Sequence, residues 1–115
     1  MSTSVSKIVT RIRETVGDET RMVWDDTADI LEVINRGRII MWAKRPEAFW
    51  TSKVLDEIPD NLTSATSGNI DVTDRYAEAL IAYCSYVLFM QQRREGDREK
   101  ASEQLDIYTR LMAGG

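Results

Sequence analysis

The chain has 115 residues, which gives room for one compact domain over residues 1–115 and not for two. Hydrophobic residues make up 43% of it and charged residues 30%, a balance that is too apolar for a disordered chain and too polar for a membrane protein. Fifteen Lys and Arg against nineteen Asp and Glu give a formal charge of −4, which argues against a protein that wraps nucleic acid, since wrapping needs a clustered basic surface.

The first predicted helix covers residues 5–16. A Ser or Thr before it can accept hydrogen bonds from the first free N–H groups, and Gly17 can adopt the left-handed conformation that ends a helix. The apolar residues recur at helical spacing and form one stripe: Val5, Ile8, Val9, Ile12 and Val16.

A second helix is predicted to begin near residues 25–27, where acidic and hydroxyl side chains can cap it. It ends at Arg45, because the residue before a proline avoids the helical region. Gly37 costs ~1 kcal/mol relative to Ala inside a helix, so it predicts a close helix crossing or a kink. The helix has two apolar faces and should pack between neighbours: Leu31, Ile34 and Met41 lie on one face, and Val33, Gly37 and Ile40 on the other.

Residues 46–72 follow without a sustained hydrophobic period. Pro46 can open a short helical turn over residues 46–50, and residues 51–72 have the Pro, Gly, Asn and Ser content of a long irregular loop. Loops longer than ~12–15 residues are uncommon inside compact domains and tend to be functional or disordered. The apolar residues in this loop need a packing partner: Val54, Leu55, Ile58, Ile70 and Val72.

Two further helices are predicted in the last third of the chain. Residues 76–90 are apolar on nearly every side but are shorter than the ~20 residues of a membrane span, which favours a buried central helix. Gly96 breaks the pattern, and Asp97 can cap a last helix whose apolar stripe is Ala101, Leu105, Tyr108 and Met112. We therefore expect an all-α fold, a small helical bundle of about four helices with a long irregular loop, in which the last two helices form an antiparallel hairpin.

Catalytic chemistry has few residues to use. The chain has no histidine and one cysteine, which removes the commonest general base, the usual zinc site and the Cys-His or Ser-His nucleophile. Capping of the second helix already explains the carboxylates Asp25, Asp26 and Asp29. The glycines between the predicted helices are isolated, so no phosphate-binding loop is present. We predict a protein that is not an enzyme and that uses no cofactor or metal.

The cysteine and the N-terminal residues bear on the compartment. Cys84 can form no internal disulfide, and its place in an apolar run predicts a buried, inert thiol. Residues 1–6 lack the apolar stretch of a signal peptide, so we expect the protein to stay in the cytoplasm where it is made.

Two features favour contacts with other macromolecules. Basic residues cluster twice, although solvated faces and helix ends also account for them: Arg36, Arg38, Lys44 and Arg45, then Arg93, Arg94, Arg98 and Lys100. The large aromatics, together with the apolar helix at 76–90, exceed what one apolar stripe per helix requires, and a dimer or ring would bury the excess: Trp24, Trp42, Phe49 and Trp50.

Two sequence blocks carry a resemblance to a known family. The first holds Val23-Trp24-Asp25-Asp26, the Leu-x-x-x-Asn spacing from Leu31 to Asn35, Gly37, and Arg45-Pro46-Glu47-Ala48. The second is the helix from Tyr76 to Tyr83, followed by a polar turn and residues 101–111. In this order and spacing, the blocks resemble the small helical head–tail adaptor (connector) proteins of tailed bacteriophages, and they cover most of the chain.

The resemblance implies a structural protein of the virion head–tail junction, present in the host cytoplasm during assembly. Its partners would be the portal protein on one side and tail or nozzle proteins on the other. Subunits that can be monomers before assembly would form a dodecameric ring through which DNA passes without specific binding, and no membrane is involved. Residues 51–72 would be an arm to a neighbouring subunit, so the predicted subunit and portal interface is Val54, Leu55, Ile58, Ile70, Trp42, Trp50, Arg93 and Arg94.

Two other classes of function stay open. A small helical nucleic-acid-binding or regulatory module would use the basic turn from Arg93 to Lys100 and would show salt-dependent affinity for DNA. A helical-bundle enzyme would need carboxylates that hold a metal ion.

Overall fold

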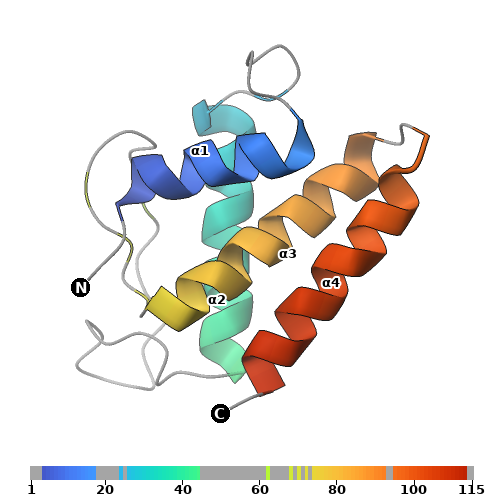
Figure 1. Ribbon diagram of the computed structural model, residues 1–115. Coiled ribbons are helices and arrows are strands. Elements are labelled where there is room, and N and C mark those ends of the chain that lie inside the picture. Colours follow the sequence, from blue (N-terminus) through green and yellow to red (C-terminus); the bar gives the residue numbers. More distant parts are fainter. Residues whose placement is uncertain are drawn as a thin grey trace.

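The computed structural model describes residues 4–17, 24, 26–44, 62, 68, 70, 72, 74–92 and 95–113. Within these ranges the chain forms four α-helices, α1 (Val5–Val16), α2 (Glu32–Lys44), α3 (Asp74–Gln92) and α4 (Asp97–Ala113). A π-helix, η1 (Asp26–Leu31), leads directly into α2. The described part of the chain contains no strand, so the predicted all-α bundle is confirmed (Figure 1).

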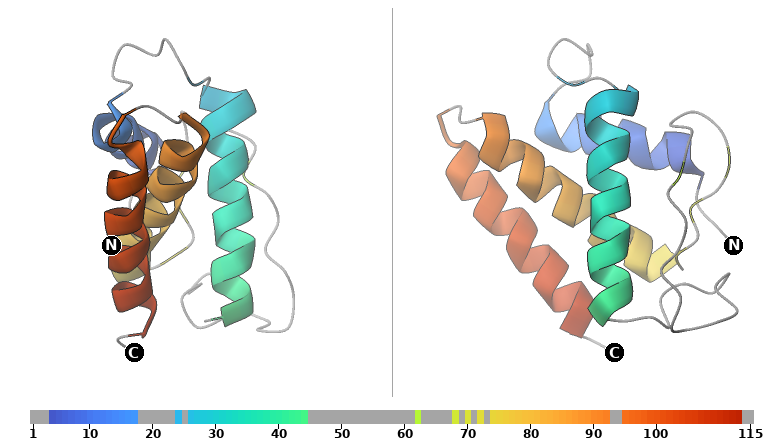
Figure 2. Two further views of the ribbon diagram at one scale, coloured as in Figure 1. Left: turned by 90° about the vertical axis from the view of Figure 1, so that its right-hand side faces the viewer. Right: turned by 180° about the vertical axis from the view of Figure 1, so that it is seen from behind.

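Helix α3 is the centre of the bundle. The helices α1, α2 and α4 each pack against it, and α4 returns antiparallel to it after the turn at Glu95–Gly96 (Figure 1). Figure 2 shows α3 between α2 and α4. Its side chains fill the core on several sides, with Leu80, Cys84 and Leu88 each 0% exposed. The predicted buried central helix is therefore confirmed.

This central position corrects one expectation. The sequence predicted more apolar surface on the second helix and on residues 76–90 than a single chain could cover. Neighbouring helices cover most of it, because α3 has a packing partner on several sides. Among the described residues, the large hydrophobic side chains that remain exposed are Ile39, Met90 and Leu105, at 38%, 45% and 39%.

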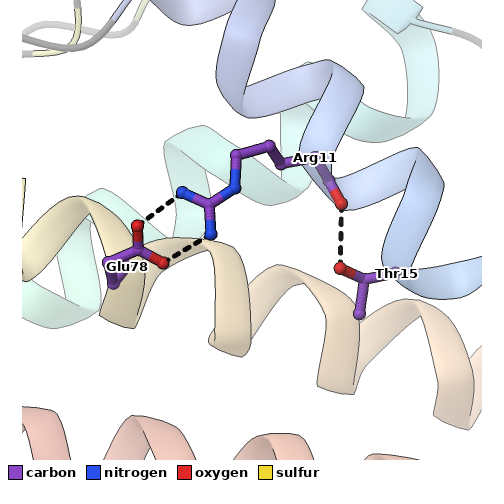
Figure 3. A network of polar contacts seen from close by, with 3 residues as sticks. All are labelled: Arg11, Thr15 and Glu78. Carbon is purple, nitrogen blue, oxygen red and sulfur yellow. Dashed lines mark hydrogen bonds and ion pairs between the residues drawn. The ribbon is translucent and has the colours of Figure 1, made fainter.

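Helix α1 begins and ends where its sequence predicted. The hydroxyl of Ser4 accepts a hydrogen bond from the Lys7 N–H at 3.2 Å, and Gly17 ends the helix in the left-handed conformation at φ 77°. Its apolar stripe is buried against the rest of the bundle. Figure 3 shows how the exposed side of α1 is also fixed to α3: the Arg11 guanidinium donates two hydrogen bonds to the Glu78 carboxylate, at 2.5 and 2.7 Å.

The second predicted helix differs from expectation at its start and agrees in its middle. Residues 26–31 form π-helical turns rather than a continuation of α2. At the crossing of α2 and α3, a Cβ atom on Gly37 would lie 2.9 Å from both Leu80 Cδ1 and Tyr83 Cδ2. The predicted close crossing is confirmed, because only a residue without a side chain fits between the helices as they stand.

The described residues of the predicted loop 51–72 pack on their own chain. The Gly68 carbonyl accepts a hydrogen bond from the Val5 N–H at 3.0 Å, and Ile70 and Val72 are 1% and 0% exposed in the core. Leu62 is held by the side chain of Asn35 on α2. At these four positions the segment is bound to the bundle rather than extended as an arm. The short turn predicted at 46–50 lies outside the described residues.

Candidate interface at the C-terminal ends of α2 and α4

Three tyrosines form an aromatic cluster on α3 and α4. The ring of Tyr83 lies 5.5 Å from that of Tyr108 and 6.5 Å from that of Tyr86, measured between centroids, and both pairs are tilted at 53°. Tilted rings at these distances attract each other through their quadrupoles. Because Gly37 lets α2 approach Tyr83 closely, this cluster joins α2, α3 and α4.

An open pocket lies beside the cluster, where the last residues of α2 and α4 meet. Its lining comes from Lys44 on α2 and from four residues near the end of α4: Tyr108, Thr109, Met112 and Ala113. The Lys44 ammonium lies 5.9 Å from the centre of the Tyr108 ring, within the range of a cation–π interaction. The Thr109 hydroxyl donates to the Leu105 carbonyl at 2.9 Å, so its proton is already used within α4.

The Tyr108 hydroxyl is the unusual group in this pocket. The residue is 5% exposed, and its oxygen has no hydrogen-bond partner among the described residues. A buried polar atom without a partner costs about 1–3 kcal/mol, so most are paired in folded proteins. Burial raises the pKa of Tyr108, and the neighbouring Tyr83 raises it further, so the phenol is protonated at neutral pH and can donate a hydrogen bond.

Among the basic residues of α2 and α4 that follow, Lys44 differs because it forms no ion pair with a described carboxylate. On α2, Arg36 pairs with Glu32 at 2.9 Å, and on α4, Arg110 lies 3.8 Å from Asp106. Lys44 has no carboxylate within ion-pair distance in the part of the chain that the structure describes. The pocket therefore presents one ammonium group beside Tyr108 and apolar side chains, while the Tyr108 hydroxyl oxygen itself is buried.

The predicted interface residues are only partly placed by the structure. Trp42 is half-buried on α2, and its indole N–H has no hydrogen-bond partner within the described ranges. Ile70 is a correction, because at 1% exposure its side chain belongs to the core and offers no surface to another subunit. The other six lie outside the described residues: Val54, Leu55, Ile58, Trp50, Arg93 and Arg94.

The described members of the predicted basic cluster on the second helix do not form one surface. Arg38 is 2% exposed and donates to the Asn35 side-chain oxygen at 3.0 Å, whereas Arg36 is exposed and paired with Glu32. In the turn between α3 and α4, the described exposed residues Arg98 and Lys100 alternate with Glu95 and Glu99. Among the described residues, neither region concentrates the positive charge that phosphate binding requires.

The sequence patterns did not predict the pocket, although they singled out two of its lining residues. Tyr108 was predicted on the apolar stripe of the last helix, and Lys44 was one of the basic residues of the second. No local pattern indicates that the ends of these two helices meet, because that contact depends on how both cross α3. A sequence also gives no indication of whether a tyrosine hydroxyl has a hydrogen-bond partner.

Metal-ligating side chains and the thiol can be checked directly in the described ranges. They contain no group of three or more His, Cys, Asp or Glu side chains placed to hold a metal ion. Cys84 is fully buried, and this burial raises the pKa of its thiol far above the usual range, which disfavours the reactive thiolate. None of the described helices is long and apolar enough to cross a membrane.

Comparison of the chain with models of protein families, with curated proteins and with solved structures gave no match.

Proposed function

We propose that this chain is a non-catalytic structural adaptor of a tailed bacteriophage. It would dock on the portal protein as a ring, extend the DNA channel and provide the attachment surface for tail components. Its place would be the head–tail junction of the virion, after assembly in the host cytoplasm. The sequence blocks that resemble connector proteins are the source of this proposal.

One structural observation supports the proposal in addition to the sequence blocks. The two blocks contact each other in the fold: Gly37 of the first packs against Leu80 and Tyr83 of the second, at the crossing of α2 and α3. Asn35, which closes the Leu-x-x-x-Asn spacing, also fixes Leu62 to α2. The residues of the resemblance are therefore ones that determine the tertiary structure, which is what a shared helical scaffold requires.

The surface offers support of a second kind. The pocket at Lys44 and Tyr108 presents an ammonium group that has no carboxylate partner in the described part of the chain. Trp42, on the same helix as Lys44, is half-buried. Aromatic side chains with a polar tip are common at the centres of protein interfaces.

The direct test is reconstitution with the portal protein of the phage that encodes the chain. Purified portal rings are incubated with excess chain, separated by size, weighed by mass photometry and imaged by electron microscopy. We expect a heavier particle with one chain per portal subunit and an added layer that continues the channel. Portal rings of unchanged mass and outline, at chain concentrations well above those of the portal subunits, would contradict the adaptor role.

A further inference from the structure

We draw no further inference here: the strongest candidate, the exposed apolar surface of the α3–α4 hairpin at Met90 and Leu105, is an unpartnered face, and nothing in the described part of the chain shows what covers it.

Discussion

The side-chain amide of Asn35 forms hydrogen bonds with both backbone groups of Leu62, which lies 27 residues further along the chain. Its nitrogen donates to the Leu62 carbonyl at 3.0 Å, and its oxygen accepts from the Leu62 N–H at 2.7 Å. The same oxygen accepts from the buried Arg38 guanidinium at 3.0 Å. One side chain on α2 thus satisfies both backbone groups of a residue that belongs to no helix.

Replacing Asn35 should therefore destabilise the fold. Asn35→Ala leaves the Leu62 groups and Arg38 without this partner, and we expect the free energy of unfolding to fall by about 2 kcal/mol, within the range for lost buried hydrogen bonds. Urea denaturation followed by circular dichroism measures the change. Gln91→Ala, at an exposed position on α3, is the control and should change the stability by less than about 0.5 kcal/mol. An equal effect of both substitutions would contradict the role of Asn35.

Gly37→Ala tests the helix crossing. The added methyl group would lie 2.9 Å from Leu80 Cδ1 and Tyr83 Cδ2, and overpacking of this kind costs about 1–3 kcal/mol. The better helix propensity of alanine returns ~1 kcal/mol, so we expect a net loss of roughly 1 kcal/mol in unfolding free energy.

A double-mutant cycle separates packing from propensity at Gly37. In a Leu80→Ala background one of the two close contacts is absent, so Gly37→Ala should cost less than in the original chain. Equal costs in both backgrounds would show that the Leu80 contact does not cause the effect.

The pair between Arg11 and Glu78 predicts a pH dependence of stability. The hydrogen bonds from Arg11 lower the pKa of Glu78 below its ordinary value of 4.5. A lowered carboxylate pKa adds stability that is fully present above the unfolded-state pKa and is lost as the pH falls through the folded-state pKa. The side chains are 40% and 49% exposed, so solvent screening limits the contribution to about 0.5 kcal/mol.

Glu78→Gln should thus be less stable than the original chain at pH 7, and the difference should close as the pH falls below about 4.5, where the carboxylate becomes protonated. Thermal unfolding across a pH series measures this. Glu103→Gln, on an exposed position of α4, serves as the matched substitution and should show no comparable closing of the difference. A constant gap between Glu78→Gln and the original chain at all pH values would exclude the carboxylate as its source.

Tyr108→Phe should stabilise the free protein. The hydroxyl is buried without a partner among the described residues, so its removal relieves a desolvation cost and should raise the free energy of unfolding by about 1 kcal/mol. Tyr86→Phe, at a half-buried position, is the comparison and should have a smaller effect. A loss of stability in Tyr108→Phe would mean that the hydroxyl already has a partner in the free chain.

The thiol of Cys84 should be unreactive until the protein unfolds. It is completely buried in α3, and burial raises its pKa, so neither access nor thiolate formation favours attack on a disulfide reagent. We expect labelling by Ellman's reagent to be negligible in buffer and complete in denaturant. In a Cys84→Ala chain, Leu105→Cys places a thiol at a 39% exposed position and should be labelled rapidly, which checks the reagent. Fast labelling of the original chain would show that α3 opens readily.

The sequence by itself determined the local structure of this protein. The hydrophobic stripe from Val5 to Val16, a preceding Ser or Thr and Gly17 predicted the first helix, because end residues act on the helix that they adjoin. The scarcity of polar residues along 76–90, where Glu78 and Ser85 are the clear exceptions, likewise identified the central helix, since a segment that is apolar on nearly every side must be covered on most sides.

Only the tertiary structure decided what lies at the surface. Ile70 looked like an interface residue because its segment lacks a period, yet it fills the core, and Arg38 looked like part of a basic patch but is buried against Asn35. The meeting of Lys44 with Tyr108 depends on the angles at which α2 and α4 cross α3, which side chains distant in sequence set together. Local patterns indicate the apolar stripe of each helix, whereas the packing of helix on helix decides which residues are covered and which remain exposed.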